Sequence, residues 1–76
     1  MATIDELVDT LIEIVPDAAT YIRHINNVYF LGVEISISGE IDGKEYHRTI
    51  RLTDEYLDED ITTIKNFLTY QIKKTA

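Results

Sequence analysis

The side chains best suited to acid–base or nucleophilic chemistry in this chain of 76 residues are two histidines and a few hydroxyls. His24 and His47 are the only histidines, and there is no cysteine. Ser38 is the hydroxyl that we expect to lie opposite His47 on paired strands. An open sheet face, however, neither excludes water nor supplies an oxyanion site. We therefore interpret the pair as polar cross-strand pairing and expect no catalytic residue and no enzyme activity.

A run of acids from Asp54 to Asp60 is a second candidate for chemistry, because carboxylate oxygens bind calcium and magnesium. The run reads DEYLDED. An EF-hand loop needs acids at alternate positions, a central glycine and a terminal glutamate, and the run lacks this pattern. The chain also has no glycine-rich phosphate loop. The sequence therefore predicts no metal site and no cofactor.

The distribution of charge is the strongest indication of function. The chain has 14 Asp and Glu against seven Lys and Arg, which gives a net charge of −7. Binding to a phosphate backbone requires a basic footprint, so direct nucleic-acid binding is disfavoured. A basic protein partner is favoured instead, and nucleic-acid-binding proteins belong to this class.

The acids near the N-terminus lie within a stretch that contains no Lys or Arg, from Met1 to Ile22. Asp5, Asp9 and Glu13 have the spacing i, i+4, i+8, so they lie on one face of a helix. Like charges at this spacing cost roughly 0.2–0.5 kcal/mol per pair. The face is either a solvated surface or a recognition surface. We predict that the partner-binding residues are Asp5, Asp9, Glu13, Asp17, Asp54, Glu55, Asp58, Glu59 and Asp60.

The elements that position these residues centre on a β-hairpin from Val33 to Leu52. Asp42-Gly43 favours a two-residue type I′ turn, which fixes the register of the two strands. Glu34 then lies opposite Arg51 on a polar face. The register pairs Val33 with Leu52, Ile35 with Ile50, Ile37 with Arg48 and Gly39 with Tyr46 on one face, and Ser36 with Thr49 and Ser38 with His47 on the other.

A helix is predicted before the hairpin. Thr3-Ile4-Asp5-Glu6 has the pattern of a capping box, in which the side chains of the first and last residues bond to each other's backbone. Apolar residues then recur with helical spacing. They are Ile4, Leu7, Val8, Leu11, Ile12 and Val15.

Pro16 interrupts this helix, since proline removes a helical N–H and disfavours the α conformation of Val15. Apolar residues nevertheless continue in phase as far as Ile25. We therefore expect helical structure through about Ile25, either as one helix kinked at Val15-Pro16 or as a second short helix. Asn26-Asn27 is expected to provide its C-terminal cap and turn.

A helical region is also predicted after the hairpin. Its N-cap is expected at Thr53, Asp54 or Asp58, and Lys73 and Lys74 suit its C-terminus. The residues with helical spacing on its buried face are Leu57, Ile61, Ile64, Leu68 and Ile72, widened by Phe67.

Together these elements predict a small α+β fold, a single domain over residues 1–76, with helices packed on one face of an antiparallel hairpin. No signal peptide or membrane-spanning segment is expected, which favours a cytoplasmic protein without a membrane partner. The hairpin edges would lie open, so a homodimer is a possible assembly.

In size, acidity, lack of cysteine and helix–hairpin–helix plan, the chain resembles the small acidic inhibitors of phages and other mobile elements, including anti-CRISPR proteins and DNA mimics. The resemblance covers the whole chain, contains no diagnostic motif and assigns no residue. It implies a non-enzymatic inhibitor that blocks a basic groove of a nucleic-acid-binding host protein. The alternative is a small structural or assembly protein that self-associates through a hairpin edge or the tyrosine-bearing flank of the last helix.

Overall fold

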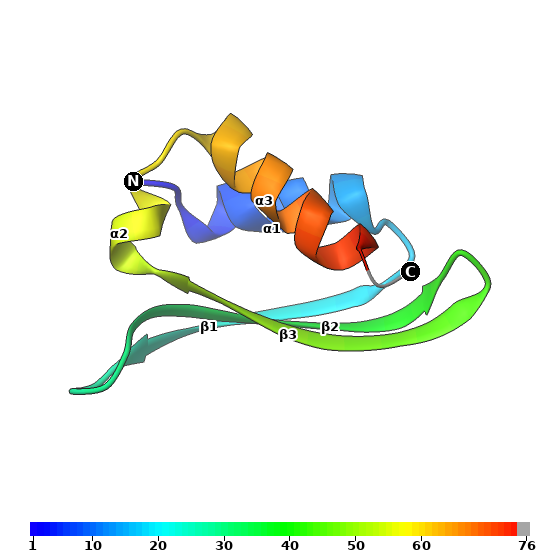
Figure 1. The fold of residues 1–76 in the computed structure, drawn as a ribbon, viewed down its shortest axis with the longest axis horizontal. Coiled ribbons are helices and arrows are strands. Elements are labelled where there is room, and N and C mark those ends of the chain that lie inside the picture. The colour runs from blue at the N-terminus through cyan, green and yellow to red at the C-terminus, as the bar shows by residue number, and fades with distance from the viewer. Residues whose placement is uncertain (75–76) are drawn as a thin grey trace.

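The computed structural model describes residues 1–74, with the backbone alone described at Ile41. In chain order the elements are α1 (Ile4–Ile14), β1 (Ala19–Asn26), β2 (Leu31–Ile41), β3 (Lys44–Thr53), α2 (Asp54–Leu57) and α3 (Ile61–Lys73). They form two layers, an antiparallel sheet in the order β1-β2-β3 and helices that cover one of its faces (Figure 1). The predicted α+β class with helices on one face is confirmed, but the sheet has three strands and not two.

The hairpin of β2 and β3 has the predicted turn and register. Asp42 and Gly43 have φ angles of 53° and 80°, as a type I′ turn requires. Every predicted cross-strand pair is present, from the turn to Val33 opposite Leu52. Side chains alternate between the two faces of a sheet, so this register fixes which of them meet the helices. The buried ones are Val33, Ile35, Ile37, Ile50 and Leu52.

The segment after Pro16 is a strand, so the prediction of helical structure through about Ile25, kinked or separate, is wrong. Pro16 ends α1, whose C-cap is Val15, because proline cannot continue the hydrogen-bond ladder of the helix. Beyond it the residues ATYIRHIN are rich in β-branched and aromatic types, and Ile22 pairs with Ile35 of β2. Ile22 and Ile25 have helical spacing in the sequence, yet lie on opposite faces of this strand.

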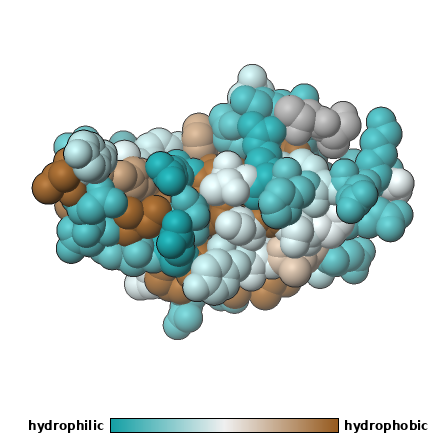
Figure 2. Space-filling model, turned by 90° about the horizontal axis from the view of Figure 1, so that it is seen from below, coloured by the Kyte–Doolittle hydropathy of each residue, from teal (hydrophilic) through white to brown (hydrophobic). Residues whose placement is uncertain are grey.

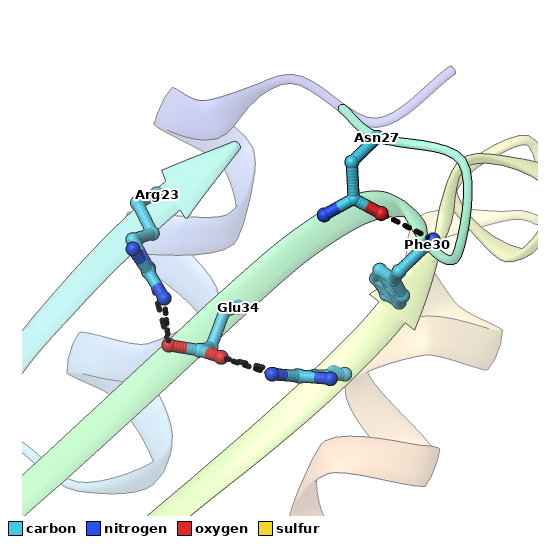
Figure 3. Close-up of polar contacts among 5 residues, drawn as sticks. Arg23, Asn27, Phe30 and Glu34 are labelled. Carbon is cyan, nitrogen blue, oxygen red and sulfur yellow. Dashed lines mark hydrogen bonds and ion pairs between the residues drawn. The ribbon is translucent and has the colours of Figure 1, made fainter. Parts of the chain in front are cut away.

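A turn from Asn27 to Phe30 connects β1 to β2. The side-chain oxygen of Asn27 accepts hydrogen bonds from the backbone N–H groups of Tyr29 and Phe30, each 2.8 Å long, and Figure 3 shows the bond to Phe30. The backbone N–H of Asn27 also donates to the carbonyl of Phe30 at 3.0 Å. The predicted helix cap at Asn26-Asn27 is therefore wrong, because Asn26 ends β1 and the turn that begins at Asn27 joins two strands.

Helix α1 begins as predicted. The Thr3 hydroxyl accepts a hydrogen bond from the backbone N–H of Glu6, and the Glu6 carboxylate accepts one from the backbone N–H of Thr3, so both halves of the capping box form. The predicted apolar face is only partly buried, because Ile4 and Ile12 are 45% and 54% exposed.

The predicted helical region after the hairpin is two helices. The Thr53 hydroxyl accepts a hydrogen bond from the backbone N–H of Tyr56 and begins α2. Asp60 precedes α3 as its N-cap, without a side-chain capping bond. Most of the predicted apolar residues are buried, namely Leu57, Ile64, Leu68 and Ile72, while Ile61 and Phe67 are half-buried.

The core lies between the two long helices and the inner face of the sheet. Its fully buried side chains include Leu7 and Leu11 of α1, Ile35 and Ile37 of β2, and Ile64, Leu68 and Ile72 of α3. No helix within residues 1–74 covers the other face of the sheet (Figure 1). Figure 2 views that outer face, where hydrophobic residues gather toward the end that carries the 27–30 turn, and hydrophilic residues toward the hairpin tip.

Two glycines of β2 lie where a side chain would not fit. A Cβ atom at Gly32 would lie 2.1 Å from the carbonyl oxygen of Leu52 on β3. Gly39 has a φ of 149°, and a Cβ atom there would lie 3.0 Å from the Cα atom of Ala18, just before β1. Tyr46 of β3 pairs with Gly39 and packs against the core.

Candidate interaction surfaces

The predicted acidic face of α1 points away from the core. Asp5, Asp9 and Glu13 are all exposed, on the side of the helix opposite the buried Leu7 and Leu11. They differ in their partners. The Glu13 carboxylate binds the ammonium group of Lys65 on α3 at 2.7 Å, whereas no ion pair within residues 1–74 involves Asp5 or Asp9.

The acids after the hairpin surround the starts of two helices. Asp54 and Glu55 occupy the first turn of α2, and Asp58, Glu59 and Asp60 come directly before α3. Carboxylates near a helix N-terminus are stabilised by the helix dipole, which accounts for part of this concentration of charge. Among residues 1–74, Asp54 is the one acid of this run with an ion-pair contact, since its carboxylate lies 3.6 Å from the imidazole of His24 on β1.

The two acidic segments meet at one end of the molecule. The backbone N–H of Ala2 donates to the carbonyl of Leu57 at 2.7 Å, which ties the start of α1 to the end of α2 (Figure 1). We call the exposed carboxylates of these segments that have no ion-pair partner in the described chain the acidic surface. It comprises Asp5, Asp9, Glu55, Asp58, Glu59 and Asp60.

Asp17 does not belong to this surface. It follows α1 at the opposite end of the helix, where it lines a small hollow with Glu40 of the hairpin and Lys73 of α3. Of the nine predicted partner-binding residues, the structure thus places Asp17 apart and gives Glu13 and Asp54 partners within the fold. The remaining six form the acidic surface.

The outer face of the sheet carries a second charged group, centred on Glu34. Its carboxylate accepts hydrogen bonds from Arg51 of β3 at 3.0 Å and from Arg23 of β1 at 3.2 Å, so one acid joins all three strands (Figure 3). The Arg51 hydrogen bond, followed by that of Arg23, holds the pKa of Glu34 below its ordinary value of 4.5. Arg51 also lies over the ring of Phe30, 5.4 Å from its centre.

The polar pair predicted across the hairpin is present as a register pair, Ser38 opposite His47. Both residues are exposed on the uncovered face. His24 faces the helices and lines an apolar hollow with Ile4 and Leu57. No group of three or more potential metal ligands occurs within residues 1–74.

Sequence reasoning missed the open edge of β1, because it predicted this segment as helix. The contact of Arg23 with Glu34 was missed for the same reason. It requires Arg23 to lie on a strand, opposite Glu34 of β2. The ion pair between Glu13 and Lys65 joins residues 52 positions apart, and no local pattern in the sequence indicates it.

No family model, curated protein or solved structure matches the chain. None of the helices in the described part of the chain is long and apolar enough to cross a membrane.

Proposed function

We propose that the protein is a non-enzymatic acidic binding module whose acidic surface occupies a basic groove of a partner protein. The observation that supports this proposal most directly is the hydrogen bond between Ala2 and Leu57, which brings the carboxylates of two distant segments to one end of the fold. A field of a single sign attracts a basic partner and accelerates its association.

The partner class follows from the chemistry of the surface. Carboxylates borne on helix starts form a compact array of negative charge, which a groove evolved to hold phosphates can accept. The partner would therefore be a nucleic-acid-binding protein, and occupation of its groove would inhibit nucleic-acid binding. The resemblance of the chain in size and charge to anti-CRISPR proteins and DNA mimics implies the same mode of action.

The first test is affinity capture of partners from the source cell, with elution by increasing salt. We expect a captured protein to bind nucleic acid by itself and to lose that binding when the acidic chain is added. Elution should occur at moderate salt, because screening weakens interactions between exposed charges.

A matched pair of variants separates the acidic surface from net charge. Asp9→Lys with Glu59→Lys reverses two charges within the surface, while Glu40→Lys with Glu45→Lys makes the same change in charge near the hairpin tip. Only the first pair should abolish capture. Equal loss in both variants would indicate a non-specific charge effect and would overturn the proposal.

A further inference from the structure

The edge strand β1 presents hydrogen-bonding groups that the fold leaves unused. The bond from the Asn27 N–H to the Phe30 carbonyl marks a hydrogen-bonded pair between β1 and β2. Hydrogen-bonded and non-hydrogen-bonded pairs alternate along antiparallel strands. Because Asn27 belongs to a hydrogen-bonded pair, the odd-numbered residues of β1 direct their N–H and C=O groups toward β2. The even-numbered residues direct theirs outward, and no second strand within residues 1–74 lies on that side of β1. They are Thr20, Ile22, His24 and Asn26.

An exposed apolar side of α1 flanks this edge. Ile4, Val8 and Ile12 lie on one side of the helix, since they are spaced i, i+4, i+8. Ile4 and Ile12 are 45% and 54% exposed, and Val8 is half-buried. Glu13 reaches Lys65 of α3 from the opposite side of the helix, so the apolar side faces away from α3.

The apolar side of α1 therefore lies above β1. Helix α3 lies above β3, because the Arg48 guanidinium of β3 donates to the side-chain oxygen of Gln71 on α3. Helix α1 contacts β1 and runs antiparallel to it, with Ile4 and His24 lining one hollow, so the middle of α1 lies above the middle of β1. Backbone groups and apolar side chains are thus available along the same edge.

We propose that this edge binds the same edge of a second copy of the chain. The two β1 strands pair antiparallel about a two-fold axis and join both sheets into one. The apolar sides of the two α1 helices then lie next to each other on the helical face. A two-fold arrangement uses the same residues of both copies, so the edge needs to be complementary only to itself.

The distribution of charge favours a second copy at this edge. The protein carries a net charge of −7 with histidine counted as neutral, yet β1 contains no acid and one arginine, Arg23. Two copies that meet along β1 therefore pair strands without placing carboxylates opposite each other.

Charge also favours one of two neighbouring registers over the other. Pairing centred on Ile22 places Tyr21 of one copy opposite Arg23 of the other on the outer face, which allows a cation–π contact. Shifting the register to centre it on Arg23 would place the two guanidinium groups opposite each other, and like charges in direct opposition destabilise a strand pair. In the first register Ile22 meets Ile22 beneath the two α1 helices.

The first experiment is sedimentation equilibrium of the full chain up to about 1 mM, the range in which weak dimers are detected. We expect a dimer that strengthens as salt rises, because salt screens the repulsion between two acidic chains. Ile12→Lys should weaken the dimer at least tenfold. Tyr70→Lys makes the same change in charge at an exposed residue of α3 and should leave the dimer unchanged.

Hydrogen exchange provides a second readout that a change in stability would not reproduce. As the concentration rises, the amides of Thr20, Ile22 and His24 should become protected, because they donate to the second copy. The amides of Tyr21 and Arg23 bond to β2 and should be protected at every concentration.

Cysteine cross-linking tests the register, and the chain contains no native cysteine. Tyr21→Cys combined with Arg23→Cys should give a disulfide-linked dimer, since these positions form a non-hydrogen-bonded pair, in which Cα atoms lie about 4.5 Å apart. Arg23→Cys alone should not cross-link. A strictly monomeric chain, a dimer that Ile12→Lys does not weaken, or protection that does not alternate along β1 would each overturn the proposal.

Discussion

The two edge strands of the sheet differ in the side chains that they direct toward the helices. On β3 this inner row includes Arg48, which bonds to Gln71 of α3. On β1 the inner row is Thr20, Ile22, His24 and Asn26, without Lys or Arg. An inward-pointing charge is a common means of preventing an edge strand from pairing with another chain. The difference indicates that β3 is protected against strand addition and that β1 is not.

The largest expected loss of stability comes from the two glycines of β2, because each packs against a different side of the sheet. Gly32 lies against β3, and Gly39 lies against Ala18 just before β1. Gly32→Ala should destabilise the fold by about 3 kcal/mol, because its methyl group would collide with the backbone of β3 at Leu52. Gly39→Ala should cost about 1–3 kcal/mol, through its φ of 149° and its closeness to Ala18 at the β1 side. Urea unfolding monitored by circular dichroism measures both.

The position of the damage should also differ between the two glycine variants. Hydrogen exchange in Gly32→Ala should accelerate first at the end of β3, and in Gly39→Ala first at the start of β1. If both variants exchanged faster along the same strand, the contacts of these glycines would not distinguish the two edges.

The protective role of Arg48 is testable by making β3 resemble β1. Arg48→Val removes the inward charge, so β3 should accept a further strand, and assemblies larger than a dimer should form at concentrations about tenfold below those of the unchanged chain. Thr49→Val adds a similar apolar side chain on the outer face of β3 and serves as the control. Light scattering after size-exclusion chromatography detects the difference, and its absence would contradict the role given to Arg48.

The β3 side also contains an unfavourable feature. The Tyr46 hydroxyl is buried and has no hydrogen-bond partner in the described residues. Tyr46→Phe should therefore stabilise the protein by about 1 kcal/mol, since it removes the cost of burying an unpaired hydroxyl. Thermal unfolding of the two proteins in parallel provides the measurement. A loss of stability would indicate that the hydroxyl has a partner in solution.

The Glu34 carboxylate accepts hydrogen bonds from both edge strands, so the pKa of Glu34 measures how strongly each edge strand holds it. Its pKa is lowered first by the hydrogen bond from Arg51 and then by that from Arg23. Arg51→Gln should consequently raise the pKa of Glu34 more than Arg23→Gln does, as measured by NMR titration of the carboxyl group. The opposite order would show that the β1 side holds this carboxylate more strongly.

The sign of the associated pH dependence follows from the lowered pKa. A group whose pKa is depressed by folding stabilises the fold above its ordinary pKa and loses that contribution as the pH falls through the folded value. The difference in stability between the unchanged protein and Glu34→Gln should thus be greatest near about pH 7 and should shrink below pH 4.5.

The hairpin was predictable because its information is local. Asp42-Gly43 specifies a turn type, and the alternation of the flanking residues specifies a single register. Strand β1 was not predictable in the same way. It bears apolar side chains on both faces, with Ile22 toward the helices and Ile25 away from them, so it lacks clean alternation and continues the helical pattern of α1 by coincidence.

The surface was predictable only as a set of exposed residues. Helix geometry places Asp5, Asp9 and Glu13 on the outward face from spacing alone. The pairing of Glu13 with Lys65 and the separation of Asp17 depend on how α1 packs against α3 and the hairpin, which is long-range information. Their role in binding a partner stays a prediction.

The restriction of all helices to one face of the sheet has a consequence for valency. In a two-fold pairing through β1, the helices of both copies lie on the same side of the joined sheet, and the antiparallel strands place the two acidic surfaces toward its opposite ends. A partner with two basic grooves, or two partners on one nucleic acid, could then engage both surfaces at once. The second contact would form at the high effective concentration set by the rigid sheet, and avidity would compensate for modest affinity at each surface.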